Sequence, residues 1–280
     1  WDELQKGGAT RHSLLINLGG GMITDMGGFA GATFKRGLHF VNIPTTLLSA
    51  VDAAVGGKTG INFNGLKNEV GAFCEAEAVI ISTLFFSTLP GEELKSGYAE
   101  MLKHGLIDRR ADYDRLLDYD IAHADLTALL PLLEESVNVK RRIVEIDPHE
   151  HGIRRALNLG HTAGHAFESL AMRRDRPIPH GYAVAWGCVV ELILSHLSMN
   201  FPSERLHRFA AYVHDNYGAF PITCEDYPEL LELMHHDKKN TSSSINFTFL
   251  KDVGEVVIDQ TATEDEIKTA LDIFRDLMHI

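Results

Sequence analysis

The chain has 280 residues and a formal net charge of −13, from 26 Lys and Arg against 39 Asp and Glu. Nucleic-acid binders need a basic face for the phosphate backbone, so this charge argues against a nucleic-acid partner. Hydrophobic residues make up 45% and charged residues 23%, which is ordinary for a globular protein with a real core, in one large domain or two of usual size.

The first part of the chain alternates short apolar runs with stretches rich in Gly and Ala. Buried strands are predicted at residues 13–21, 40–49 and 78–86. Strands that alternate with helical or loop segments favour an α/β layer architecture with parallel strands. We therefore predict an α/β fold for the N-terminal part of the chain.

From about residue 90 the apolar residues recur with helical periodicity. The predicted helices cover residues 91–107, 126–146, 160–172, 181–199, 203–217 and 263–280, and residues 245–258 are typical of a short hairpin. We expect a boundary near residue 90, with an α/β part at 1–90 and a mainly α-helical part at 91–280.

Two general features favour a cytoplasmic protein without a membrane partner. The three cysteines are far apart and form no CxxC pair, which predicts reduced thiols. The most apolar run begins at Tyr182 and is interrupted by Glu191 and Ser195, so a buried helix fits it better than a membrane span.

The stretch "GGGMITD", from Gly19 to Asp25, follows the first predicted strand. Consecutive glycines let the backbone approach a pyrophosphate, and amide groups at such a turn bind phosphate. The stretch is not the GxGxxG dinucleotide fingerprint. Taken alone, it is as consistent with a plain tight turn as with a cofactor site.

The segment from Pro44 to Phe73 gathers an unusual set of polar side chains: Thr45, Thr46, Asp52, Lys58, Lys67 and Asn68. Hydroxyls, an acid, two lysines and an amide could hold a polyhydroxylated anionic ligand beside a nucleotide. A solvated loop is the plainer interpretation of scattered charges. The apolar, Gly-rich flanks argue against a simple polar face.

Three histidines lie within 24 residues, and the spacing of two of them suits a metal. His161 and His165 are four positions apart and share one helix face, and His180 follows a short loop. Two histidines and a carboxylate leave open positions for a substrate, as in catalytic zinc sites. HxxxH also arises by chance, and an isolated glutamate such as Glu100 on an amphipathic helix normally faces solvent. The spacing alone leaves the question open, as it does for the basic residues Lys140 and Arg154 and the stretch 237–240.

Five stretches in order make the combined set recognisable: "GGGMITDMGGFAGATFKRG", "IPTTLLSAVDAAVGGKTGIN", "SGYAEMLKHG", "RRALNLGHTAGHAFE" and "HGYAVAWG". Together they resemble 3-dehydroquinate synthase, in the sugar phosphate cyclase superfamily, from about Gly19 to Asn240. The resemblance implies a Rossmann-like NAD-binding N-terminal domain followed by a mainly helical metal- and substrate-binding domain. It also implies an incomplete first domain, because family members have an additional N-terminal α/β portion.

The resemblance implies a role for each matching position. Zn²⁺, with Co²⁺ as the alternative metal, would be bound by Glu100, His161 and His180. NAD would contact Gly19, Gly20, Gly21, Met22, Asp25, Thr45, Thr46, Lys58, Lys67 and the stretch Phe85 to Thr88. Substrate would contact Asp52, Lys58, Asn68, Lys140, Glu150, Arg154, Asn158, His165 and Lys238, with His165 near the phosphate and Glu150 acting through ordered water. Arg36 resembles the arginine that family dimers lend to the neighbouring subunit.

The implied activity is that of a phosphorus-oxygen lyase of the shikimate pathway, in aromatic amino acid biosynthesis. A cytoplasmic homodimer would convert 3-deoxy-D-arabino-heptulosonate 7-phosphate to 3-dehydroquinate and phosphate. The chemistry is transient oxidation by NAD, phosphate elimination, re-reduction and aldol ring closure. Two positions depart from the family pattern: Ala53 follows the motif Asp where Ser is common, and Tyr182 replaces a common Glu.

Other functions remain as alternatives. A 2-deoxy-scyllo-inosose or epi-valiolone synthase would use zinc and NAD in the same way. Arg154, Asn158 and Lys238, however, favour a carboxylated substrate. A metal-dependent polyol dehydrogenase is not expected to carry "VDAAVGGKTGIN". The missing N-terminal portion motivates a third alternative, an inactive truncated fragment.

Overall fold

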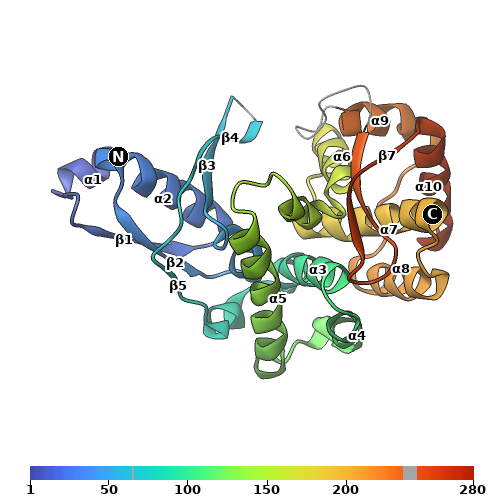
Figure 1. Ribbon diagram of the computed structural model, residues 1–280, viewed down its shortest axis with the longest axis horizontal. Helices are drawn as coiled ribbons and strands as arrows, with labels where there is room; N and C mark the ends of the chain where they lie inside the picture. Colours follow the sequence, from blue (N-terminus) through green and yellow to red (C-terminus); the bar gives the residue numbers. More distant parts are fainter. Residues whose placement is uncertain (65, 236–244) are drawn as a thin grey trace. The chain divides into compact units, whose positions relative to one another are not determined.

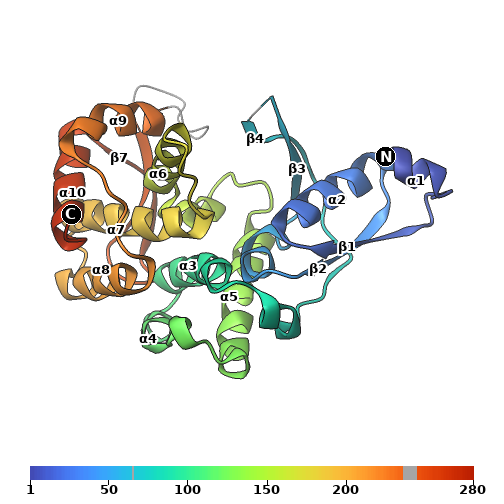
Figure 2. The ribbon, with the colours of Figure 1, turned by 180° about the vertical axis from the view of Figure 1, so that it is seen from behind.

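The structure, a computed structural model, describes residues 1–64, 66–235 and 245–280, without the side chains of residues 66 and 67 (Figures 1 and 2). The chain forms two compact units. Unit 1 comprises Trp1–Gly97 and Asp125–His149, and unit 2 comprises Tyr98–Ala124 and Glu150–Ile280. The segment Asp125–His149 therefore belongs with the N-terminal part of the chain. The domain boundary expected near residue 90 stays a prediction.

A parallel sheet is the framework of unit 1. It has the order β1 (Leu14–Gly19), β2 (His39–Pro44) and β5 (Ala78–Val79), and β1 pairs with β2 along its whole length. Helix α2 (Gly21–Thr33) follows β1 after a single residue and packs against the sheet (Figure 1). A strand, a tight turn and a helix returning over the sheet confirm the predicted α/β fold. Leu14, Ile16 and Leu18, which alternate along β1, are more than half exposed.

One prediction in unit 1 was wrong in detail, and one segment was left open by the sequence. The strand expected at 78–86 pairs over only two residues, and the rest forms a 3₁₀ segment, Thr83–Thr88, whose first turn is capped by the Ser82 side chain. A hydrogen bond from the backbone to a serine hydroxyl competes with strand pairing, and the periodicity of apolar residues does not reveal such a bond. The segment from Pro44 to Phe73, for which a solvated loop was the plainer interpretation, contains a π-helical turn, Ser49–Ala53, and a hairpin of β3 (Lys58–Phe63) and β4 (Leu66–Phe73).

Unit 1 also contains two helices, α1 (Asp2–Lys6) and α5 (Leu126–Ile146). Helix α5 packs against the π-helical turn and the 3₁₀ segment. It has the predicted bounds and is capped by Asp125, whose carboxylate accepts from the amides of Thr127 and Ala128. A capping aspartate satisfies amides that the first helical turn leaves unpaired.

Unit 2 is mainly helical, as predicted. Helix α3 begins in unit 1 and ends in unit 2. The elements are α3 (Gly91–Ile107), α4 (Arg110–Asp118), α6 (His161–Arg173), α7 (His180–Met199), α8 (Ser203–Tyr217), α9 (Tyr227–His235), β6 (Ile245–Leu250), β7 (Val256–Ala262) and α10 (Glu264–Leu277). β6 and β7 form the expected hairpin, and Thr263 and Glu266 form a capping box at the start of α10. Helices α4 and α9 were not predicted.

Helix α7 lies at the centre of unit 2, with α6, α8, α10 and β6 against it (Figures 1 and 2). It is the one helix in the described part of the chain that is long and apolar enough to cross a membrane, and 72% of its most apolar window is buried within the protein. The burial agrees with the core helix expected here. Gly164 of α6 permits the contact with α7, because a Cβ there would lie 2.8 Å from the Ala183 carbonyl oxygen.

Candidate active site

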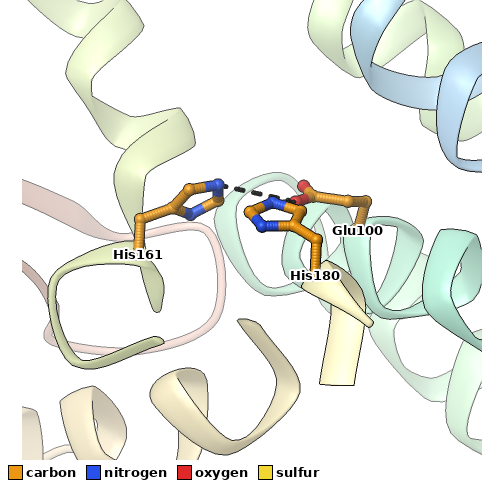
Figure 3. Close-up of side chains that lie close together, drawn as sticks. All are labelled: Glu100, His161 and His180. Atoms are coloured by element: carbon orange, nitrogen blue, oxygen red, sulfur yellow. Dashed lines mark ion pairs between the residues drawn. The ribbon is translucent and has the colours of Figure 1, made fainter. Parts of the chain in front are cut away.

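Three side chains that could hold a metal ion converge in unit 2 from three different helices (Figure 3). Glu100 lies within α3, His161 is the first residue of α6, and His180 is the first residue of α7. The Nε2 atoms of His161 and His180 each lie 3.5 Å from Oε1 of Glu100. Helix starts at residues 161 and 180 thus bring together side chains that are far apart along the chain.

Glu100 is completely buried, so the ordinary interpretation of an isolated helical glutamate as solvent-facing was wrong. Residues 98–106 of α3 are buried on every side of the helix, and an amphipathic pattern cannot reveal such a position. Lys103, one turn later and 1% exposed, forms an ion pair with the carboxylate. Burial raises the pKa of Glu100, but the Lys103 ammonium and the nearby histidines outweigh it and hold the pKa well below its usual value.

Lys103 is a site residue that the sequence analysis missed. Its only signal was the spacing Glu-x-x-Lys, which places both side chains on one helix face. That spacing is common on exposed helices, where such a pair contributes little. Burial of both partners is what makes this pair significant.

The two histidines are oriented by contacts at their second ring nitrogens. Nδ1 of His161 lies 3.1 Å from the Leu159 carbonyl oxygen, and Nδ1 of His180 lies 3.4 Å from Oε2 of Glu168. Metal-binding histidines commonly donate their other N–H in this way, which leaves Nε2 as the ligand atom. Burial lowers the pKa of His180, but the carboxylates of Glu100 and Glu168 outweigh it and raise the pKa to about 9.

This donor set fits a zinc ion. Oε2 of the buried Glu100 carboxylate faces the Lys103 ammonium, and Oε1 faces Nε2 of both histidines. Zn–N and Zn–O bonds of about 2.0–2.2 Å in a tetrahedron place neighbouring ligand atoms about 3.3–3.5 Å apart. The 3.5 Å separations at Glu100 Oε1 agree with that spacing. Three protein ligands of this kind match a catalytic site, which leaves a position open for substrate.

His165 belongs to the same cluster. Its ring centroid lies 5.3 Å from that of His161 and 5.9 Å from that of His180. His165, Glu168 and His180 also form a second group whose ligand atoms lie within 4.8 Å of one another. Helix α6 therefore presents residues 161, 165 and 168 on one face, as the four- and three-residue spacings require.

Three further predicted residues lie in unit 2. The Asn158 amide donates to Oε1 of Glu150 at 2.8 Å, so these two predicted residues contact each other. Arg154 is 3% exposed in the 3₁₀ segment Ile153–Asn158. A buried guanidinium is expensive unless it is paired, and its planar fork suits a carboxylate.

In unit 1, Lys140 and Asp52 are brought together. The Lys140 ammonium forms an ion pair with the Asp52 carboxylate and donates to the Asp52 backbone carbonyl at 2.5 Å. Asp25 lies in α2 in the same electrostatic environment. Burial and the Asp52 charge raise the pKa of Asp25 to about 7, although Lys140 acts in the opposite direction.

The glycine turn joins β1 to α2. Gly20 is the N-cap of α2, and within the described residues no side chain caps this helix. The space over the turn is narrow, because a Cβ on Gly20 would lie 3.2 Å from Thr46 and one on Gly21 3.3 Å from Ala53. The Thr45 amide donates to the Gly19 carbonyl at 2.9 Å, which joins the ends of β1 and β2. An uncapped helix start at the carboxyl edge of a parallel sheet fits a dinucleotide phosphate.

The remaining predicted residues are more dispersed. Thr46 has a structural role, because its hydroxyl accepts from the Ser49 amide. Lys58 and Asn68 lie on the β3–β4 hairpin, and Phe85 and Thr88 lie in the 3₁₀ segment of unit 1. Arg36 lines a surface cavity of about 440 Å³ with Thr10, Arg11 and Lys35. The Lys67 side chain and all of Lys238 lie outside the described residues.

Comparison with sequence families gives two adjoining matches. The family model described as 3-dehydroquinate synthase N-terminal matches residues 1–96, and the model described as 3-dehydroquinate synthase C-terminal matches residues 97–240. A protein named 3-dehydroquinate synthase from Parabacteroides distasonis is 56% identical over 99% of this chain and 78% of its own. One of the same name from Thermococcus kodakarensis is 41% identical over 99% of this chain and 76% of its own.

Solved structures show the same fold. The 2-epi-5-epi-valiolone synthase from Streptomyces hygroscopicus subsp. jinggangensis 5008, with NAD⁺ and Zn²⁺ bound, has a TM-score of 0.84 at 25% identity, covering 98% of this chain and 77% of its own. A 2-deoxy-scyllo-inosose synthase with carbaglucose-6-phosphate, NAD⁺ and Co²⁺ also has a TM-score of 0.84, at 20% identity over 98% of this chain and 76% of its own.

Proposed function

Because the chain belongs to the 3-dehydroquinate synthase family, we propose that it converts 3-deoxy-D-arabino-heptulosonate 7-phosphate to 3-dehydroquinate and phosphate. The observation that carries the proposal is 56% identity to a 3-dehydroquinate synthase over 99% of the chain. The cluster of Glu100, His161 and His180 supports it, since its donor set fits the metal chemistry of the reaction. The proposed reaction is that of a phosphorus-oxygen lyase, because phosphate leaves by elimination and the redox change is reversed within each turnover. Its substrate and product belong to the shikimate pathway.

Glu100, His161 and His180 would hold Zn²⁺ or Co²⁺. When bound, the metal would supply positive charge to substrate hydroxyls, and NAD would supply reversible hydride transfer. Lys103 keeps the Glu100 carboxylate ionised, and therefore able to act as a ligand, before the metal arrives. Glu168 and the Leu159 carbonyl hold the two imidazole rings with Nε2 toward Glu100.

Unit 1 supplies the NAD site in this proposal. Amides of the Gly19–Gly21 turn and the start of α2 would bind the pyrophosphate, with Met22 and Asp25 on the same helix. The remaining contacts follow from the family resemblance and come from Thr45, Thr46, Lys58, Lys67, Phe85 and Thr88. Supporting this assignment, solved relatives of the same fold have NAD⁺ bound.

Substrate recognition calls for groups that match a carboxylate, several hydroxyls and a phosphate. Arg154 offers a planar fork for the carboxylate, and Asn158 offers an amide for a hydroxyl. His165 would hold the phosphate and assist the departure of the C6 proton, and Glu150 would act through ordered water. Further contacts follow from the family resemblance and come from Asp52, Lys58, Asn68, Lys140 and Lys238.

We further propose that the enzyme acts in the cytoplasm as a homodimer. The three cysteines are free thiols, which suits a reducing compartment. In the dimer, Arg36 would contact the phosphate bound to the neighbouring subunit. Its position beside Arg11 and Lys35 supports an anion there.

The proposal is tested by product formation from purified chain, Zn²⁺, NAD⁺ and 3-deoxy-D-arabino-heptulosonate 7-phosphate, with phosphate and 3-dehydroquinate both quantified. We expect equal amounts of the two products, and none without NAD⁺. Glucose 6-phosphate, which lacks the carboxylate, serves as the comparison substrate and should release no phosphate. Phosphate release from glucose 6-phosphate alone would assign the chain to the related cyclases instead.

A further inference from the structure

Glu191 lies on α7, and its buried carboxylate accepts hydrogen bonds from the start of α6. It is fully buried, eleven residues after the ligand His180. Its Oε2 accepts from the Gly160 amide at 2.8 Å, and its Oε1 accepts from the amides of Thr162 and Ala163 at 3.1 and 3.4 Å. One side chain thus takes three backbone donors at the beginning of α6.

These donors need an acceptor from elsewhere because α6 cannot provide one. Its N-cap is Gly160, which has no side chain, and the first amides of any helix have no partner within the helix. A carboxylate at a helix start also complements the positive end of the helix dipole. Glu191 therefore does what a capping serine or aspartate does in other helices, but from the neighbouring helix.

The close packing of α6 and α7 explains why the N-cap is glycine. Gly160 has φ +78°, and a Cβ there would lie 2.4 Å from Sγ of Cys188. A Cβ on Gly187 would lie 2.0 Å from the Gly160 carbonyl oxygen. A local cap has no room at this crossing, whereas a side chain on α7, one turn beyond Cys188, can reach the amides.

The segment that Glu191 holds is the one that presents His161. His161 is the first residue of α6, between two of the amides that bind Glu191. The Leu159 carbonyl, immediately before Gly160, is the group 3.1 Å from Nδ1 of His161. Displacement of this turn would therefore move both the backbone of the ligand and the acceptor that fixes its ring.

We propose that Glu191 is a positioning residue of the metal centre, holding the Leu159–Ala163 turn so that Nε2 of His161 faces Glu100. The inference rests on the metal site of the proposed function and goes beyond it, because Glu191 is not among the proposed metal or substrate contacts and acts through the backbone of α6. Outer contacts of this kind, when removed, commonly reduce metal affinity about 10–100-fold.

Two variants test the proposal. Glu191→Gln keeps the shape but replaces one accepting oxygen by a donating amide, and Glu191→Asp keeps the charge but withdraws it by one methylene. We expect each to weaken zinc binding at least about tenfold in competition with a chelator. We also expect the visible absorption of the Co²⁺-loaded protein to change, which reports the geometry of the ligands. Glu191→Asp retains the buried charge and serves if Glu191→Gln does not fold.

Ser195→Ala is the matched control. Ser195 is fully buried one turn later on α7, where its hydroxyl accepts from the Leu250 amide. We expect it to lower thermal stability but to leave zinc affinity and the Co²⁺ spectrum unchanged. Unchanged zinc affinity and spectrum in both Glu191 variants would overturn the inference alone. Failure of the unmodified chain to bind zinc would overturn the metal site itself.

Discussion

The Glu100 carboxylate and the Lys103 ammonium are both buried in unit 2, at 0% and 1% exposure of their side chains. Removing one partner of a buried ion pair leaves an uncompensated charge, at a cost of about 3–5 kcal/mol. A metal at Glu100 would compensate that charge in another way. The same ion pair thus stabilises the metal-free protein and keeps the Glu100 carboxylate ionised, as a metal ligand must be.

Lys103→Met should therefore lower the free energy of unfolding by about 3–5 kcal/mol in the metal-free protein, and by clearly less when zinc is bound. Urea unfolding with and without Zn²⁺ measures both values. Lys268→Met removes an exposed ion pair with Glu264 and should change stability by no more than about 1 kcal/mol. An equal loss with and without zinc would contradict the role assigned to Lys103.

Asp25 makes the stability of the protein depend on pH. Its pKa is raised to about 7 from an unfolded value near 3.8, so the native state keeps a proton that the unfolded state loses. The contribution of Asp25 to stability should then fall as pH rises from about 4 to 7, and no further above that. The advantage of Asp25→Asn over the unmodified chain should grow across the same window. Thermal unfolding from pH 4 to 8, without NAD⁺, measures it.

Asp215→Asn, at a carboxylate with a side chain 76% exposed, is the control and should show no such window. A constant difference between Asp25→Asn and the unmodified chain at every pH would mean that Asp25 titrates normally.

Arg154 and Arg155 are neighbours with opposite surroundings, which makes them a matched pair. Arg154 is buried, whereas Arg155 is partly exposed and donates to Asp259 at 2.8 and 2.9 Å. Lysine cannot reproduce the bidentate contact of arginine with a carboxylate. Arg154→Lys should lower kcat/KM for the carboxylated substrate about 10- to 150-fold, since a lost contact to a charged group costs about 1.5–3 kcal/mol. Arg155→Lys should leave it within twofold, and equal effects of the two changes would count against the assignment.

At the scale of elements, long helices were predictable, whereas the short helices α4 and α9 and the irregular segments were not. The bounds expected for α3, α5 and α8 agree with the structure, because their apolar periodicity extends over several turns. The π-helical turn Ser49–Ala53 and the β3–β4 hairpin lie in a polar, Gly-rich segment without a clear period. Their conformation depends on contacts with α2 and α5, which lie outside the segment.

The crossing of α6 and α7 is the element contact most sensitive to a single methyl group. Gly187→Ala places a Cβ 2.0 Å from a backbone oxygen, which cannot move aside as a flexible side chain can. We expect a loss of about 1–3 kcal/mol or more and weaker zinc binding, because Gly160 precedes the ligand His161. Gly91→Ala, in a helix with no atom within 4 Å of the new Cβ, should be neutral or slightly stabilising. Denaturant unfolding and zinc titration compare the two, and equal stability would contradict the tight crossing.

At the scale of the whole molecule, the site depends on positions that no local pattern reveals. The HxxxH spacing suited a metal but left the question open, and the set of Glu100, His161 and His180 came only from the family resemblance. The burial of Glu100 results from α3 being enclosed within unit 2, which is a tertiary effect. The roles of Lys103, Glu168 and Glu191 became visible only when contacts between helices were known. The sequence therefore supplied the proposed ligands, and the structure supplied the contacts that surround them.

The most direct test of the account is the rate of phosphate release from 3-deoxy-D-arabino-heptulosonate 7-phosphate by metal-free chain titrated with Zn²⁺ in the presence of NAD⁺. Because one site of three ligands is proposed, we expect no release after EDTA treatment and a rate that rises to a plateau at one zinc per chain. Glu100→Gln should abolish the response, whereas Glu93→Gln, at an exposed glutamate on the same helix, should leave it unchanged. Phosphate release by the EDTA-treated chain at the same rate would contradict the central claim.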